Sequence, residues 1–136
     1  MAKGRDDGTA DPAGTGVRWG VLGLAALLCA CADKSDPPRV VMGADAARGL
    51  EIIDRVGCGA CHRTPGVSWP KGLAGPSLEG FADSPMIAGQ FPNRPDLLIA
   101  FLKDAPSMAP ATAMPPMPLT DAEARDVAAY LYTLHD

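Results

Sequence analysis

The sequence of 136 residues predicts one small all-α domain in which three main helices are joined by loops rich in glycine and proline. Two observations indicate this class. Residues 45–56, 93–103 and 120–134 carry apolar side chains at helical spacing. Between these segments lie ten of the chain's 14 prolines and no run typical of a buried strand. Residues 63–92 are therefore expected to form at most short helical turns.

The first predicted helix covers residues 45–56. Asp45 suits its N-cap, and Gly57 suits the stop that follows its last turn. Gly49 costs about 1 kcal/mol relative to alanine in the middle of a helix. A glycine at this position therefore predicts the close approach of another helix.

The second predicted helix covers residues 93–103. Pro95 suits its first turn, and either Asn93 or Arg94 suits the cap. Pro106 prevents its continuation, because the residue before a proline disfavours helical dihedrals. The segment thus has a defined beginning and a defined end.

The last predicted helix has the clearest start signal in the chain. Thr120 and Glu123 have the spacing of a capping box. Residues 106–119, which precede it, hold five prolines and predict a stiff, extended loop. The apolar stripe of this helix comprises Ala124, Val127, Ala128, Leu131 and Leu134, with Tyr130 at its border.

The most specific motif is Cys58-Gly59-Ala60-Cys61-His62. C-x-x-C-H is the attachment signal for c-type haem, in which two thiols add to one porphyrin and the imidazole becomes an iron ligand. A thioredoxin-type pair would need a preceding strand, whereas the segment before this motif is predicted to be helical. A zinc site would need a second ligand pair, and the only other histidine is His135. We therefore predict one haem c, covalent through Cys58 and Cys61, with His62 as the proximal iron ligand.

Residues 1–31 resemble a targeting segment and are excluded from the fold. The apolar run of residues 19–30 is short for a membrane span and suits the core of a signal peptide. Leu28-Cys29-Ala30-Cys31 resembles a bacterial lipobox, which predicts cleavage before Cys31 and a lipid on that cysteine. A plain cleavable signal and a short uncleaved anchor are the alternatives. Because residues 1–16 are nearly neutral, we also hypothesise that translation begins nearer Val17.

The predicted organisation has three parts: a signal and lipobox segment at 1–31, a flexible tether at 32–43 and one domain at 44–136. Haem is attached to such motifs outside the cytoplasm, so the signal and the motif support each other. The expected location is periplasmic, with an N-terminal lipid on the membrane. The net charge of −4 without a basic block gives no indication of nucleic-acid binding.

From residue 45 to residue 134 the chain resembles class I monohaem cytochromes c. The elements follow the order of that family: a helix with a glycine, the haem motif, a Gly-Pro-x-Leu stretch, a Met-Pro loop and a terminal helix. The resemblance implies the small cytochrome c fold, with three main helices around one covalent haem. It implies that the terminal helix crosses the first helix near Gly49. It also implies that the carbonyl of Pro76 accepts a hydrogen bond from Nδ1–H of His62.

The resemblance further implies a methionine as the sixth iron ligand, on the loop before the last helix. Met114, followed by Pro115, best matches the ligand position, and Met117 is the alternative. Two positions depart from many relatives. Gln90 stands where arginine is common, and Phe101 stands near the position of a tryptophan. In those relatives the arginine and the tryptophan usually bind a haem propionate. We therefore expect a less positive propionate pocket here and a somewhat lower reduction potential.

A haem iron with two protein ligands offers no open position for a substrate. The expected function is therefore one-electron transfer between respiratory partners on the outer side of the cytoplasmic membrane, not enzymatic catalysis. The alternatives are an electron-transfer subunit of a dehydrogenase or terminal oxidase, and a ligand sensor or peroxidase. Expected partners are a redox donor and a redox acceptor protein. Acidic side chains outnumber basic ones, 16 to 12, so a lysine-ringed docking face is not expected.

Overall fold

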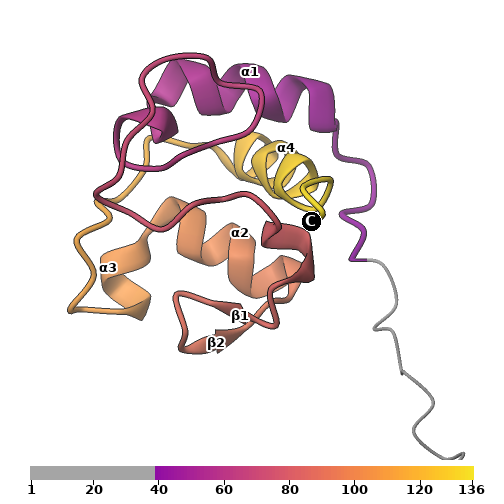
Figure 1. Cartoon of the computed structure of the whole chain (residues 1–136). Helices are drawn as coiled ribbons and strands as arrows, with labels where there is room; N and C mark the ends of the chain where they lie inside the picture. The colour runs from indigo at the N-terminus through magenta and orange to yellow at the C-terminus, as the bar shows by residue number, and fades with distance from the viewer. Residues whose placement is uncertain (1–38) are drawn as a thin grey trace, which may run out of the picture. The chain divides into compact units, whose positions relative to one another are not determined.

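The computed structural model describes residues 39–136 (Figure 1). The predicted signal segment, the proposed lipid site Cys31 and most of the predicted tether lie outside these described residues. In chain order the elements are α1 (Ala46–Val56), the 3-10 turns η2 (Cys58–Ala60) and η3 (Phe81–Asp83), β1 (Met86–Ile87), β2 (Phe91–Pro92), α2 (Pro95–Lys103), α3 (Ala105–Met108) and α4 (Asp121–Leu131). The predicted all-α class is confirmed, and α1, α2 and α4 are its three main helices.

The ends of α1 are fixed by the residues that the sequence indicated. The side chain of Asp45 accepts hydrogen bonds from the backbone N–H groups of Ala47 and Arg48. Gly57 adopts a left-handed conformation with φ 81°, and its N–H bonds the carbonyls of the last turn. The helix therefore stops directly before the cysteine motif.

The start of α4 is equally well determined. The hydroxyl of Thr120 accepts from the backbone N–H of Glu123, and the carboxylate of Glu123 accepts from the backbone N–H of Thr120. This reciprocal pair satisfies two amide groups that the first turn would otherwise leave unbonded. The predicted capping box is confirmed.

Helix α2 begins at Pro95 as predicted, with Arg94 at the cap position, although no side chain bonds the first turn. The prediction of an extended loop from residue 106 is wrong at its beginning, because residues 105–108 form the short helix α3. Pro106 lies in the first turn of α3, where its missing N–H removes no helical hydrogen bond. Asp104 caps this turn by accepting from the N–H of Ser107 at 3.2 Å.

Residues 63–92 contain one feature that the sequence analysis did not predict. β1 and β2 form a two-stranded antiparallel ladder, with Ile87 paired to Phe91 and Met86 paired to Pro92. The turn between them contains Gly89 at φ 67°. Two residues per strand are too few to give an alternating sequence pattern, so no periodicity could indicate this ladder.

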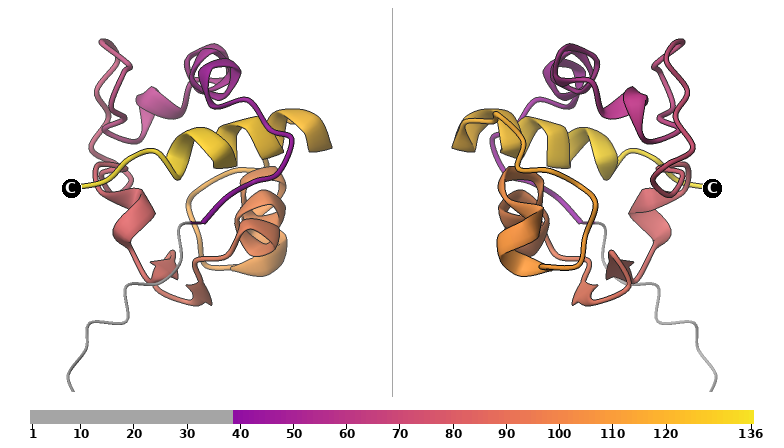
Figure 2. Two further views of the ribbon diagram at one scale, coloured as in Figure 1. Left: turned by 90° about the vertical axis from the view of Figure 1, so that its right-hand side faces the viewer. Right: turned by 90° about the vertical axis from the view of Figure 1, so that its left-hand side faces the viewer.

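Helix α4 lies between α1 and α2, as the views in Figure 1 and Figure 2 agree. A Cβ atom built on Gly49 of α1 would lie 2.1 Å from the backbone oxygen of Asp126 in α4. The two backbones therefore touch at this crossing, which confirms the predicted close approach. The largest fully buried side chains include Ile53, Ile87, Leu98 and Val127.

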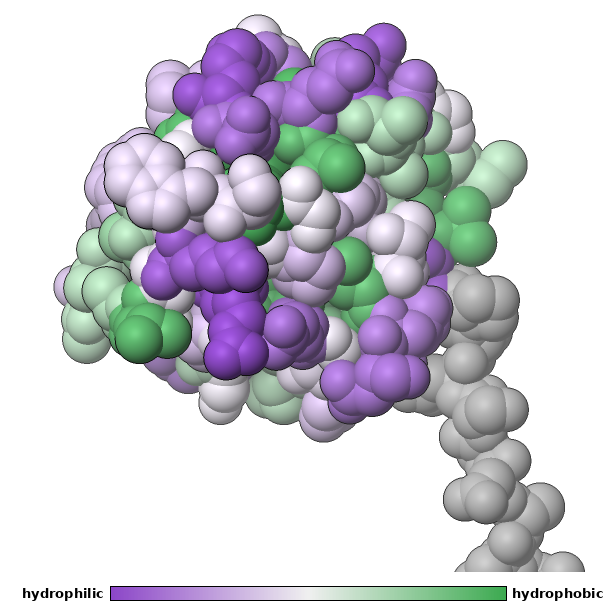
Figure 3. Space-filling view, turned by 45° about the horizontal axis from the view of Figure 1, so that its top comes forward, coloured by the Kyte–Doolittle hydropathy of each residue, from purple (hydrophilic) through white to green (hydrophobic). Residues whose placement is uncertain are grey.

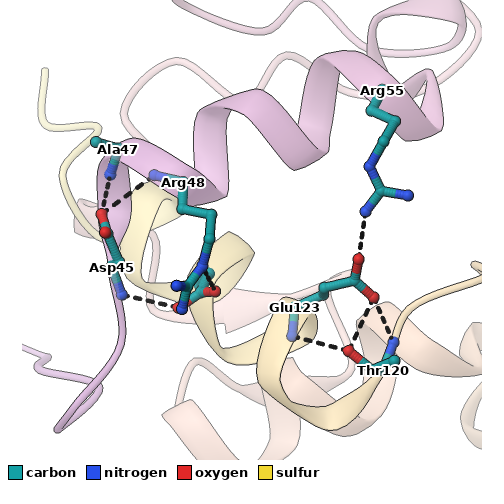
Figure 4. Close-up of polar contacts among 7 residues, drawn as sticks. Asp45, Ala47, Arg48, Arg55, Thr120 and Glu123 are labelled. Atoms are coloured by element: carbon teal, nitrogen blue, oxygen red, sulfur yellow. Dashed lines mark hydrogen bonds and ion pairs between the residues drawn. The ribbon is translucent and has the colours of Figure 1, made fainter.

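Polar contacts join α1 to α4 at both ends of the crossing (Figure 4). The carboxylate of Asp126 is only 2% exposed, and it accepts from the backbone N–H of Asp45 at 2.8 Å and from Nε of Arg48 at 2.6 Å. Arg55, in the last turn of α1, pairs with Glu123 in the first turn of α4. Within residues 39–136, no helix is long and apolar enough to cross a membrane.

Candidate haem site

The cysteine motif forms a tight turn at the end of α1. The backbone N–H groups of Cys61 and His62 both donate to the carbonyl of Cys58, at 3.2 and 3.0 Å. Cys58 is half-buried and Cys61 is exposed, and both thiols are free. Burial raises the pKa of the Cys58 thiol above its usual range. Gly57 makes this arrangement possible, because its left-handed backbone turns the chain away from the helix axis.

The imidazole of His62 is oriented by its neighbours. Its Nδ1 atom lies 2.7 Å from the carbonyl oxygen of Pro76. A carbonyl can only accept, so Nδ1 donates this hydrogen bond, and Nε2 is the nitrogen that could ligate a metal. A Cβ atom built on Gly75 would lie 2.4 Å from Cε1 of this ring. Glycine is thus the one residue that lets the loop run so close beneath the imidazole.

Residues 72–78 run back along the motif. The N–H groups of Gly72, Gly75 and Leu78 donate to the carbonyls of Gly59, Cys61 and Arg63, at 2.8, 2.8 and 2.9 Å. The Gly72 contact is close, since a Cβ atom there would lie 2.3 Å from the oxygen of Ala60. Neither the contact of Gly72 nor the ring contact of Gly75 follows from a local sequence pattern. The available signal was the presence of two glycines, Gly72 and Gly75, among the four residues before Pro76.

The two candidate methionines lie on the loop between α3 and α4. Met114 is half-buried, packs against the hydrophobic core, and donates its backbone N–H to the hydroxyl of Thr112 at 3.2 Å. Met117 is also half-buried, and its backbone N–H bonds the carbonyl of Lys103 at 3.1 Å. The structure thus brings together both cysteines, the histidine and Pro76, while either methionine would come from a separate segment.

Three further residues from the sequence analysis, Gln90, Phe101 and His135, lie outside the motif and its paired loop. Gln90 is exposed in the turn between β1 and β2, and Phe101 is buried against Phe91 with ring centroids 6.3 Å apart. His135 is exposed, and its Nδ1 lies 2.7 Å from a carboxylate oxygen of Asp83. In the part of the chain that the structure describes, no three His, Cys, Asp or Glu side chains form a group that could hold a metal ion.

The residues present fit a covalently attached haem. They supply two free thiols in one turn, an imidazole whose Nε2 could ligate iron, and half-buried apolar side chains around the core. Thr64 adds a buried hydroxyl that has no hydrogen-bond partner within residues 39–136. The half-buried apolar residues include Leu78, Phe91, Leu97, Ile99, Met108 and Met114.

A comparison with protein families matches residues 46–135 to the family described as Cytochrome c. The match runs from the first residue of α1 to the residue before the chain end, and so includes the motif, its paired loop and the methionine loop. A comparison with curated proteins finds no match. The family implies haem c attached through cysteines, which agrees with the free thiols of the motif. The chain therefore belongs to the cytochrome c family and carries haem c covalently bound through Cys58 and Cys61.

Proposed function

We propose that this cytochrome is a closed one-electron carrier in which Nε2 of His62 and the sulfur of Met114 are the two axial ligands. The family supports a haem-based role in electron transfer. The observation that carries the finer proposal is the contact of His62 Nδ1 with the carbonyl of Pro76 at 2.7 Å, because it fixes the tautomer and directs Nε2 away from the loop.

Bound haem c supplies an iron that gains or loses one electron, and thioether ligation favours its reduced state. The chain's task is to keep both ligands in place. Pro76 and Gly75 hold the imidazole from one side. Met114 is followed by Pro115 and Pro116, whose fixed φ angles restrict how far the loop moves. Ligands held in this way leave no position for a substrate and little structural change between oxidation states.

The spectrum of the haem-loaded protein tests this ligand set. We expect a weak long-wavelength band from sulfur to ferric iron, and no spectral change when carbon monoxide is added to the reduced form. Met114→Ala should abolish the band and admit carbon monoxide. Met117→Ala is the matched control, since it removes a half-buried methionine from the same loop, and it should leave both properties unchanged. A wild-type iron that binds carbon monoxide readily would contradict the proposal in favour of a ligand sensor or an enzyme.

We also propose that the carrier works on the outer side of the cytoplasmic membrane, held there by a lipid on Cys31, between respiratory donor and acceptor proteins. The lipobox-like sequence and the maturation of such haem motifs outside the cytoplasm support this location. Mass spectrometry of the N-terminal peptide from membranes tests it. Cys31→Ser should release the protein from the membrane fraction, whereas Cys29→Ser should not. A lipid-free N-terminus in the wild type would contradict the anchor without affecting the ligand assignment.

A further inference from the structure

Two large apolar side chains stand in solvent on the loop that follows the haem motif. Trp69 is 81% exposed and Leu73 is 83% exposed. A folded domain gains nothing from exposing side chains of this size so fully on one short loop. Figure 2 shows this loop as a narrow hairpin at one edge of the domain.

The loop is fixed to the haem motif. The N–H of Gly72 bonds the carbonyl of Gly59 at 2.8 Å, and the N–H of Gly75 bonds that of Cys61 at the same distance. In addition, a Cβ atom on Gly59 would lie 2.7 Å from the carbonyl oxygen of Pro70. Pro70 and Gly72, whose backbones approach Gly59 of the motif, thus lie between Trp69 and Leu73 in the sequence. Their position relative to the motif is set by the backbone.

The charge distribution separates this region from the rest of the described chain. Residues 57–78 contain two side chains with full charge, Arg63 and Lys71, and no acidic residue. Residues 105–120, which include the proposed ligand Met114, contain no Asp, Glu, Lys or Arg. By contrast, hydrophilic side chains cover much of the face on which α1 lies (Figure 3). Both segments are therefore low in charge, and Glu79, which directly follows the first one, pairs with Arg63 at 3.4 Å.

We propose that Trp69 and Leu73 form a docking patch for a redox partner whose own surface is apolar and bears acidic rather than basic side chains at its rim. The proposal rests on the proposed function, because ligation of one iron by His62 and Met114 places both low-charge segments beside the haem. A partner seated on the patch then lies next to the attachment motif. Because Arg63 pairs with Glu79, the charge next to Trp69 and Leu73 in the loop is that of Lys71, which repels a basic partner and attracts an acidic one.

The patch has the size expected for a transient redox contact. Two exposed side chains with their neighbours make a small interface, which suits partners that must separate after each electron. Exposed aromatic residues often supply most of the binding energy at such contacts. Contact through apolar groups is not screened by salt, so the docking step should depend little on ionic strength.

Gold electrodes coated with alkanethiol monolayers of equal thickness serve as the probe, with methyl, carboxylate or amine end groups. The purified haem-loaded full chain is used throughout. We expect faster electron transfer on the methyl surface than on the amine surface, and no change of the methyl rate with ionic strength. Trp69→Ser combined with Leu73→Ser should slow transfer on the methyl surface by about tenfold, the effect of losing about 1.4 kcal/mol of docking energy. Leu73→Ser alone should show a smaller loss in the same direction.

The matched control is Val40→Ser combined with Met42→Ser, which also removes two exposed apolar side chains, 61% and 77% exposed. This control should leave the rate on the methyl surface unchanged. Equal rates for the two double variants would overturn the docking patch. Trp69-dependent binding to phosphatidylglycerol vesicles, or a Trp69-dependent dimer in sedimentation, would overturn it in favour of a membrane or a second copy. A mediated redox titration of the haem-loaded protein in solution tests the proposed function separately from the docking patch. The absence of a reversible one-electron couple would refute the carrier itself.

Discussion

Asp126 is the residue at which the apolar pattern of α4 is interrupted inside the fold. Its carboxylate lies at the crossing of α1 and α4 and is satisfied by the backbone N–H of Asp45 and by Nε of Arg48. A buried carboxylate without such donors would be strongly unfavourable. The guanidinium of Arg48, with the amide of Asp45, holds the pKa of this carboxyl below its usual range. Asp126 therefore joins the N-terminus of α1 to α4 most strongly while it is ionised, because the pairing with Arg48 needs its charge.

Asp126→Asn tests this role through pH. Asparagine keeps an acceptor for the amide of Asp45 but loses the charge that pairs with Arg48. Because the folded-state pKa is lowered, the charge contributes fully above the unfolded value of about 3.9 and is lost as pH falls through the folded value. We expect the variant to be less stable by about 1–2 kcal/mol at pH 7, since Arg48 is partly exposed. Urea titrations from pH 7 to pH 2 should show this difference shrinking toward zero.

The control for this pH series is Asp96→Asn. Asp96 also pairs with an arginine, Arg94 at 2.7 Å, but both side chains are more than half exposed. Such a pair is screened by water and contributes little to folding. A pH-dependent loss as large as that of Asp126→Asn would show that burial at the helix crossing is not the cause.

Gly49 decides how closely the helices α1 and α4 pack. Gly49→Ala would gain helix propensity in α1 but would place a methyl group 2.1 Å from the backbone oxygen of Asp126. We expect the overpacking cost to dominate and the free energy of unfolding to fall by about 1–3 kcal/mol. Urea unfolding followed by far-UV circular dichroism measures it. Ala47→Gly, at an exposed position of the same helix, gives the propensity term separately.

The capping box makes a similar contribution at the start of α4. Thr120→Ala should lower the free energy of unfolding by about 1 kcal/mol, because the amide of Glu123 loses its acceptor. Glu123→Gln keeps a side chain that can accept from the backbone of Thr120, so it should cost less. The two variants are compared in the same urea titration. A larger loss for Glu123→Gln than for Thr120→Ala would point to the ion pair with Arg55 rather than the cap.

For the whole molecule, the covalent haem is expected to be part of the fold as well as of the chemistry. The described domain is small and has few aromatic residues, so it has a limited core of its own. Cys58→Ala combined with Cys61→Ala prevents covalent attachment. We expect this variant to unfold at lower urea concentration and with a shallower transition than the haem-loaded protein. An unchanged midpoint would show that the polypeptide core is sufficient without attached haem.

The sequence by itself determined the features that depend on neighbouring residues. Helix ends could be predicted because caps act within one turn of the chain. Asp45 and Gly57 marked the two ends of α1, and Thr120 with Glu123 marked the start of α4. The C-x-x-C-H spacing predicted the cofactor for the same reason, since both thiols and the imidazole must reach one porphyrin from five consecutive residues. The glycine in the middle of α1 also predicted the close approach of another helix at Gly49, while the resemblance implied that this is the terminal helix.

Only the tertiary structure decided which distant groups meet. No local pattern showed that Asp126 would bond the cap of α1, or that residues 72–78 would run along the haem motif. The short helix α3 and the two-residue strands were also missed, because elements of two to four residues have no detectable periodicity. The exposure of Trp69 and Leu73 is a property of the folded surface. Caps and motifs are local contacts that the sequence specifies directly, whereas burial and pairing depend on how the whole chain packs.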